Sequence, residues 1–167
     1  MPYTLSENYR LKRLAKLASS GQQVLDIGCA QYPNIYLQNT EVTGLDLENA
    51  ILPPNYTSFI NTDVSKIPDL NLSYDTVIAG EILEHLEDPI GFLRQCHSCL
   101  KDNGKIILST PNPHSIFETI LTIFLNKKFF YTKDHVMLFP QRWLIRMMER
   151  AGFSDIKLYS EVFLFHL

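Results

Sequence analysis

The sequence predicts an α/β protein in which helices cover a doubly wound, mostly parallel sheet. Apolar runs of strand length alternate along the chain with longer segments whose apolar residues recur at helical spacing. The run at residues 24–27 is typical of a central strand, and Gly28 follows it where a tight turn lets a ligand approach the backbone. A second run ends on Asp46, twenty residues beyond Asp26. Sheets of this kind place a carboxylate near that position to bind the hydroxyls of a ribose.

Bulk properties indicate one globular domain over residues 1–167, long enough for a complete core. The net charge of −3 gives no general attraction to nucleic acid or to an anionic membrane, so a small-molecule partner is expected. No apolar stretch reaches the length of a membrane span, and the first residues do not resemble a signal peptide. Three cysteines, Cys29, Cys96 and Cys99, offer no disulfide framework, which favours a cytoplasmic location.

The first half of the chain contains one clear helix and several short elements. Residues 7–18 place leucines at helical spacing among four cations, which predicts an amphipathic helix with solvated charges; a phosphate-contacting role for those cations is the alternative. Pro33 is expected to open a short helix after the first strand. Residues 49–57, which include two prolines, predict a connection without helix, and residues 58–64 predict the third strand.

The second half continues the alternation of strands and helices. Its expected elements are a strand at 74–80, a helix at 90–100, a strand at 105–110, a helix at 140–151 and two short strands at 156–160 and 162–167. Cys96 and Cys99 form a CxxC within the helical pattern, but no second pair exists to complete a metal site. We therefore expect both cysteines to be core residues.

The loop after the first strand decides between two classes of nucleoside cofactor. A dinucleotide site would require GxGxxG, whereas this chain has GCAQYP. The carboxylate of Asp26 would repel a pyrophosphate but suits a cationic ligand. S-adenosylmethionine is an adenosine compound that carries a sulfonium and an ammonium but no phosphate, so it fits both Asp26 and Asp46. A nicotinamide-dependent oxidoreductase is correspondingly disfavoured.

Over nearly all of its length the chain resembles the class I S-adenosylmethionine-dependent methyltransferases. The stretches that carry the resemblance occur in the family's order: VLDIGCA, VTGLDLE, NTDV, YDTVIAGEILEHLEDP, FLRQCHSCLKDNGKIILSTPNP and DHVMLFPQRWLIRMMERAGF. The resemblance implies a single Rossmann-like sheet of seven strands in the order 3-2-1-4-5-7-6, with the last strand antiparallel.

The resemblance also implies a set of cofactor-binding residues at the ends of the first four strands. These are Asp26, Gly28, Cys29, Ala30, Asp46, Leu47, Asp63, Val64 and Gly80. Asp63 would contact the adenine, the alternative being a cap for the segment that begins at Ser65. The family's usual GxGxG is altered here, because Ala30 and Tyr32 replace its second and third glycines, and Tyr32 would lie near the methionine tail. A protein that binds S-adenosylmethionine without turnover is therefore an alternative function.

The end of the fourth strand carries an ExxEH sequence, formed by Glu81, Glu84 and His85. If a helical turn begins at Glu81, these three side chains share one face and could bind a divalent cation, Mg or Zn, with His135 as fourth ligand. This resembles the small-RNA 2′-O-methyltransferases, in which ExxEH and a later histidine bind a metal, and the ubiquinone-pathway O-methyltransferases, which share the EH. Without a metal, Glu81 would border the cofactor while Glu84 and His85 support the loop.

The resulting hypothesis is a methyltransferase that acts on an oxygen of a small-molecule, sugar or lipid-linked acceptor. Methyl transfer from a sulfonium is an in-line displacement, so the protein must align the acceptor and remove its proton. His135 is the first candidate for the base, followed by His85, Glu81 and His114.

Residues 113–139 correspond to the family's substrate lid and include a strongly apolar stretch at 116–131. This stretch is too short and too interrupted by charges to span a bilayer. We expect either a helix packed on the sheet, a helix that covers the acceptor, or a surface for peripheral contact with a lipid-linked substrate.

Overall fold

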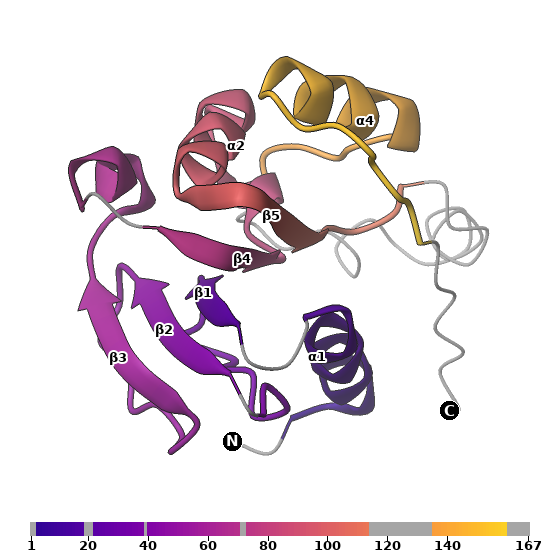
Figure 1. Cartoon of the computed structure of the whole chain (residues 1–167). Helices are drawn as coiled ribbons and strands as arrows, with labels where there is room; N and C mark the ends of the chain where they lie inside the picture. Colours follow the sequence, from indigo (N-terminus) through magenta and orange to yellow (C-terminus); the bar gives the residue numbers. More distant parts are fainter. Residues whose placement is uncertain (1–2, 19–21, 39, 71–72, 114–134, 160–167) are drawn as a thin grey trace.

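The computed structural model describes residues 3–18, 22–38, 40–70, 73–113 and 135–159. Within them, five strands form one sheet in the order β3-β2-β1-β4-β5 (Figure 1). The strands are β1 (Gln23–Ile27), β2 (Glu41–Asp46), β3 (Tyr56–Asn61), β4 (Tyr74–Gly80) and β5 (Leu100–Ser109). All neighbouring strands are parallel, which confirms the predicted order of the first five strands.

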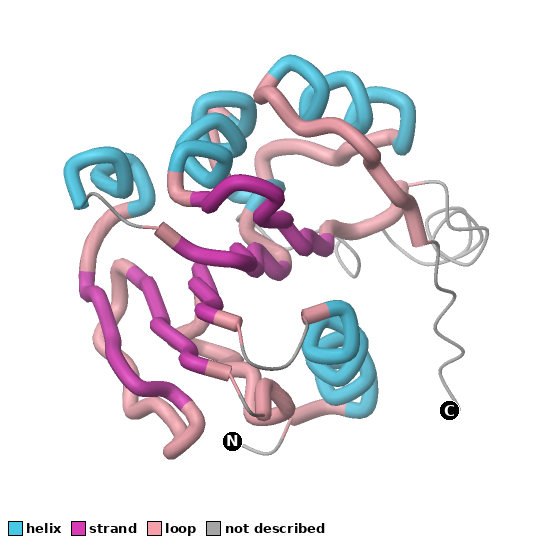
Figure 2. The backbone as a smooth tube through the Cα atoms, viewed as in Figure 1, coloured by secondary structure: helices cyan, strands magenta, loops and turns pink. Residues whose placement is uncertain are grey.

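Helices cover both faces of this sheet. They are α1 (Leu5–Leu17), α2 (Pro89–Ser98) and α4 (Gln141–Arg150), together with 3-10 helices at Val64–Leu70 and Leu83–His85. Figure 2 shows α1 on one side of the strands and α2 and α4 on the other. Two core clusters follow the same division, since one contains side chains of α2 and α4 and the other contains Leu14 of α1. The molecule is therefore a three-layer α/β sandwich over its described residues.

Two parts of the predicted sheet are not found in the described residues. The strand expected at 156–160 is absent over Ile156–Tyr159, where the backbone is irregular. Leu158 and Tyr159 are exposed there, and the Tyr159 ring lies under the Arg13 guanidinium, 5.2 Å from ring centre to charge. The strand expected at 162–167 lies outside the described residues, so the seven-strand order stays a prediction.

The described residues of the connection from β1 to β2, 28–38 and 40, contain no helix, so the helix expected after Pro33 is wrong. The backbone turns around the buried side chain of Asn34 instead. Its amide donates to the Leu11 carbonyl of α1 at 3.0 Å, and its side-chain oxygen accepts from the Tyr36 N–H at 3.1 Å. Side-chain hydrogen bonds thus hold the loop in the place of helical ones.

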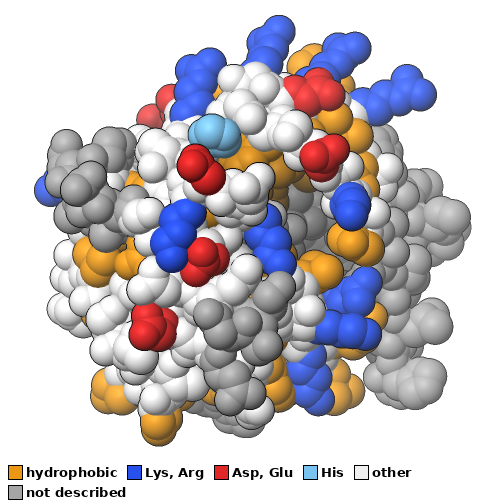
Figure 3. All heavy atoms as spheres, in the orientation of Figure 1, with side chains coloured by type: hydrophobic (Ala, Val, Ile, Leu, Met, Phe, Trp, Pro, Cys, Tyr) orange, Lys and Arg blue, Asp and Glu red, His pale blue; other side chains and the backbone are white. Residues whose placement is uncertain are grey.

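The face of the molecule seen in Figure 3 carries charges of both signs. Lys and Arg side chains gather along the rim over α2 and α4, with acidic side chains between and below them. This face therefore offers no surface of a single sign for a polyelectrolyte.

We predict that Asn34→Ala lowers the free energy of unfolding by roughly 2–3 kcal/mol, because it removes the bond to the Leu11 carbonyl and leaves the Tyr36 N–H without its acceptor. Asn49→Ala, at an exposed position in the next connection, is the control and should stay within about 0.5 kcal/mol of the original protein. Chemical denaturation measures both. An Asn34 variant as stable as the control would contradict the role of this side chain.

Candidate functional site

The two carboxylates predicted to bind the cofactor lie on the same face of the sheet. Leu25, Ile27 and Leu45 belong to the core shared with α2 and α4. Because side chains alternate along a strand, Asp26 and Asp46 both point to the other face, toward α1. Asp26 is paired with Gly44, two residues before Asp46, so the two carboxylates lie near each other at the ends of neighbouring strands.

The Asp46 carboxylate binds the loop that follows β1. One oxygen accepts from the Ala30 N–H at 2.7 Å and the other from the Glu48 N–H at 3.0 Å. The Gly28 N–H donates to the Leu45 carbonyl at 2.8 Å, so the loop is tied to the end of β2 twice. Each carboxylate oxygen retains acceptor capacity for a ligand hydroxyl.

Gly28 is needed for this turn because its φ is +75°, a left-handed conformation that side chains disfavour. A Cβ there would also come within 3.3 Å of the Ile82 side chain. Cys29 then turns inward, and its sulfur would lie 2.8 Å from a Cβ at Gly44. Burial raises the pKa of the Cys29 thiol to about 12, so this side chain is a neutral packing group and leaves its backbone for any ligand.

Asp26 is buried, with 6% of its surface exposed. The Tyr56 hydroxyl donates to one of its oxygens. Burial raises the pKa of Asp26 to about 6, against the opposing effects of the Tyr56 hydrogen bond and the positive charge of Arg10. The carboxylate is therefore poised to gain from a cation, because a cationic ligand would offset its loss of hydration.

Arg10 is a site residue that the sequence interpretation missed, since the cations of this helix were expected to be solvated. A Cβ at Gly80 would meet an Arg10 guanidinium nitrogen at 2.6 Å and the Leu14 side chain at 3.3 Å. Arg10 thus reaches from α1 to the end of β4, beside Asp26. Its place four residues before the buried Leu14 was the available signal, because i and i+4 share a helix face.

Tyr32 does not fill the space between the two carboxylates. Its ring lies 6.0 Å from the Tyr3 ring, centre to centre, and its hydroxyl is hydrogen-bonded with Glu7 at the start of α1. The substitution of a glycine by Tyr32 therefore adds a contact to α1 and leaves Asp26 and Asp46 facing a common side.

The predicted adenine-binding residues lie around the ends of β2 and β3. Asp63 accepts from the Ser65 N–H at 2.8 Å, and this bond lowers the pKa of Asp63. Val64 packs partly buried against the core, and Leu47 is exposed. The capping geometry of Asp63 is present, and its adenine contact stays a prediction.

The predicted helical turn from Glu81 is only partly correct. Glu81 has a left-handed φ of 55°, and its N–H donates to the Ser109 carbonyl of β5 at 3.0 Å. The 3-10 helix begins after it, at Leu83. Glu81 is thus held to the sheet edge and does not share a helix face with Glu84 and His85.

Glu84, His85 and His135 nevertheless converge. They offer three ligand atoms within 4.8 Å of one another, and the two imidazole rings are 4.7 Å apart in an edge-to-face arrangement. The Val136 N–H donates to the Glu84 carbonyl at 2.9 Å, which brings the segment that follows His135 to the end of β4. Glu81 is outside this group of three in the described structure.

The Glu84 carboxyl has unused binding capacity. It is fully buried, and one oxygen accepts from the Thr110 hydroxyl at 3.3 Å while the other has no partner. Burial and then the charge of Glu81 raise the pKa of Glu84. An unpartnered carboxylate oxygen beside two imidazoles is the donor set that a divalent cation takes, so the residues fit a metal.

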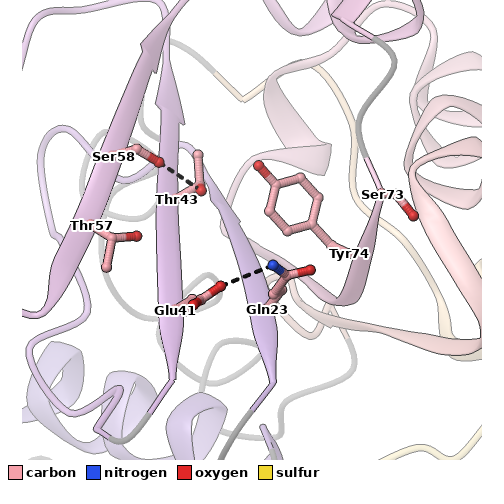
Figure 4. Close-up of a pocket in the computed structure, with 7 residues that line it drawn as sticks. All are labelled: Gln23, Glu41, Thr43, Thr57, Ser58, Ser73 and Tyr74. Atoms are coloured by element: carbon pink, nitrogen blue, oxygen red, sulfur yellow. Dashed lines mark hydrogen bonds between the residues drawn. The ribbon is translucent and has the colours of Figure 1, made fainter.

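A separate hollow of about 320 Å³ lies at the opposite ends of the strands (Figure 4). Gln23, Glu41 and Tyr74, which begin β1, β2 and β4, line it. Figure 4 shows two internal hydrogen bonds across it, between Gln23 and Glu41 at 2.9 Å and between Thr43 and Ser58 at 2.8 Å. Its polar groups largely satisfy one another, whereas ligands of parallel sheets bind at the carboxyl ends.

Comparison with known proteins identifies the family of this chain. Residues 2–158 match the sequence model of a methyltransferase domain family. The chain belongs to this family. Its fold is that of the class I S-adenosylmethionine-dependent methyltransferases, and the family match rules against the nicotinamide alternative.

Named relatives of this methyltransferase are longer proteins. A ubiquinone biosynthesis O-methyltransferase from Xanthomonas euvesicatoria is 34% identical over 110 residues, covering 58% of this chain and 46% of that protein. Another from Marinobacter nauticus is 29% identical over 112 residues, covering 58% and 47%. The chain thus spans about half the length of these curated relatives.

Solved structures share the methyltransferase fold. A provisionally named O-methyltransferase from Nostoc punctiforme superposes with a TM-score of 0.70 at 20% identity, covering 92% of this chain and 52% of that one. An S-adenosylmethionine-dependent methyltransferase from Thermotoga maritima superposes with a TM-score of 0.71 at 16% identity, covering 89% of this chain and 71% of that one.

The segment predicted to be a substrate lid, 113–139, is described only at residue 113 and from His135 onward, so the lid stays a prediction. His114 lies outside the described residues. Within the described part of the chain, every helix is too short or too polar to cross a bilayer.

We predict that Asp26 makes the ligand-free protein less stable as pH rises. Its pKa is raised from 3.8 to about 6 in the folded state, so the contribution of the neutral carboxyl is complete below about pH 3.8 and is lost as pH rises through about 6. The free energy of unfolding of Asp26→Asn, relative to that of the original protein, should therefore increase by up to roughly 3 kcal/mol between pH 4 and 7.5. Urea denaturation measures both proteins. A constant difference between the two proteins over this range would contradict the buried carboxylate.

Proposed function

We propose that this domain transfers the methyl group of S-adenosylmethionine to a hydroxyl oxygen. The observation that carries the proposal is the placement of Asp26 and Asp46 on one face, at the ends of adjacent parallel strands. Asp46 would accept from the ribose hydroxyls, and Asp26 would bind the ammonium of the methionine part. Arg10, which lies beside Asp26, would pair with the methionine carboxylate.

Several neighbours complete the cofactor site. Gly28, Ala30 and Gly80 would present backbone to the ligand, Cys29 would do so through its peptide group, and Leu47, Asp63 and Val64 would surround the adenine. The strand ends support this arrangement, because the Asn61 side-chain amide donates to the Asp46 and Leu47 carbonyls at 3.1 and 2.8 Å. The ends of β2 and β3 are thereby fixed relative to each other.

An oxygen acceptor is favoured by the names of the relatives, which are O-methyltransferases, and by the imidazoles beside Glu84. Displacement at the methyl carbon requires an acceptor oxygen in line with the sulfur and a group that takes its proton. His135 is the proposed base, with His85, Glu81 and His114 as the remaining candidates.

The acceptor is proposed to be a small molecule, a sugar or a lipid-linked compound. Apolar side chains follow His135 and are exposed: Val136, Met137, Leu138 and Trp143. They would contact the apolar part of an acceptor, or a membrane surface that carries it. We place the reaction in the cytoplasm, since Cys29, Cys96 and Cys99 are all free thiols.

Glu84, His85 and His135 would hold a divalent cation, Mg or Zn, and Glu81 would be the additional ligand nearest to Glu84. A bound cation would supply positive charge that favours the ionised form of an acceptor hydroxyl. The protein's own groups would fix its position, because the Thr110 hydroxyl orients the Glu84 carboxylate. In the metal-free alternative, the same contacts only brace the loop after β4.

A protein that binds the cofactor without turnover is the competing proposal. It is supported by the altered loop, in which Ala30 and Tyr32 stand where glycines are usual and no helix follows. Binding of S-adenosylmethionine without methyl release on any acceptor pool would favour this alternative.

We predict that Asp46→Ala weakens the binding of S-adenosylhomocysteine at least about tenfold, because the ribose hydroxyls lose a charged acceptor. Asp102→Ala, which removes an exposed carboxylate of β5, is the control and should bind like the original protein. Isothermal titration calorimetry measures the affinity of the original protein and of both variants. Equal affinities would remove Asp46 from the cofactor site.

We predict that chelation lowers methyl transfer to a hydroxyl acceptor by at least about tenfold and that added Mg or Zn restores it. His135→Ala and Glu84→Gln should lower transfer likewise, and cofactor binding should be retained, because neither side chain contacts the cofactor in this proposal. Metal content of the purified protein gives an independent measurement. Full activity after chelation and in both variants would exclude the cation from the mechanism.

A further inference from the structure

A chain of hydrogen bonds leads from the loop after β1 to Asp26. The Asn34 N–H donates to the Tyr56 hydroxyl oxygen at 2.7 Å, and the Tyr56 hydroxyl donates to the Asp26 carboxylate. Asn34 is itself fixed from two sides, since its side chain donates to the Leu11 carbonyl and its own carbonyl accepts from the Asn55 side chain at 2.9 Å. The last link of this chain, Tyr56, is therefore held rigidly.

The direction of these bonds is determined by the groups involved. The Tyr56 oxygen accepts from Asn34, so its hydrogen is left for Asp26. Burial, followed by the charge of Asp26, raises the pKa of Tyr56, which keeps the phenol protonated and able to donate. One oxygen of Asp26 is thus assigned to Tyr56, and this bond fixes the rotation of the carboxylate.

The Tyr56 side chain reaches Asp26 across the strand that lies between them. Tyr56 begins β3 and packs with the core beneath α1, and the strand between it and Asp26 carries Gly44 directly opposite Asp26. A side chain at Gly44 would meet neighbours at 2.8 to 3.2 Å, so the strand between them has no room for a bulkier residue. Tyr56 crosses β2 to reach β1.

We propose that Tyr56 is a positioning residue, which holds the Asp26 carboxylate in the orientation that receives the ammonium of S-adenosylmethionine. The inference rests on the proposed function, in which Asp26 binds that ammonium.

Three of the elements around Asp26, and the loop after β1, contribute a group that affects its charge. Arg10 of α1 and the Tyr56 hydroxyl of β3 favour the carboxylate, as does the Asn34 N–H of the loop, whereas Asp46 of β2 disfavours it. Gly80 of β4 adds no charge. Loss of the Tyr56 hydroxyl alone therefore makes Asp26 harder to ionise.

The test compares Tyr56→Phe with Tyr36→Phe. Phenylalanine retains the ring and its packing in both variants, and the Tyr36 hydroxyl donates to Asn8 at 2.7 Å, away from Asp26. S-adenosylhomocysteine is titrated into each protein from pH 5 to pH 8 by calorimetry, alongside the original protein and Asp26→Asn. Carbon-detected NMR follows the Asp26 carboxyl in the ligand-free proteins.

The original protein is expected to lose affinity below about pH 6, where Asp26 becomes protonated. In Tyr56→Phe the midpoint of this loss should rise by about one pH unit, in the calorimetry and in the NMR titration alike. Affinity at pH 6 should fall about fivefold. Tyr36→Phe should keep the original midpoint.

Failure of the inference and failure of the proposed function give different results. If Tyr56→Phe retains the original midpoint while Asp26→Asn loses the pH dependence, Tyr56 has no positioning role and the cofactor site stands. If Asp26→Asn binds like the original protein over the whole range, the assignment of the ammonium to Asp26 is wrong, and the inference fails with it. A general loss of folding in Tyr56→Phe would appear as a lower melting temperature. The NMR titration of the protein that remains folded would still give the pH midpoint of Asp26 and so test the inference.

Discussion

The parallel pairing of β1 between β2 and β4 is the constraint on which the site depends. In this register Ile27 is opposite both Leu45 and Ala79, so the three strands end at one edge of the sheet. The residues that follow each strand are thereby brought together although they are far apart in sequence. Loops are then attached to this edge by hydrogen bonds from their backbone N–H groups, such as those of Ala30 and Glu81.

The central strands β1, β2 and β4 could be predicted because they are short and most of their residues are buried. The observed bounds of β4, Tyr74–Gly80, are those expected, and the common face of Asp26 and Asp46 follows from a period of two. The loop after β1 could not be predicted in this way. Asn34 organises it through side-chain bonds to distant backbone groups, and such bonds leave no periodicity, whereas Pro33 gave a misleading helix signal.

The cluster of Glu84, His85 and His135 could likewise be predicted only in part. Adjacent residues Glu84 and His85 were expected together and are together, but the placement of His135 depends on a backbone bond between Val136 and Glu84. No spacing rule encodes that contact, and only the resemblance indicated it. Spacing misplaced Glu81, because a left-handed residue at a strand end breaks the helical count.

The contact of Arg10 with Gly80 has a consequence for how the molecule is made. Arg10 is synthesised seventy residues before Gly80, so α1 leaves the ribosome long before its docking surface exists. A contact of this sequence separation forms late, after the strands between have paired. The strand ends that are proposed to hold the methyl donor therefore come together only once the fourth strand has been translated and inserted, and ligand capture would report on the completion of this half of the domain.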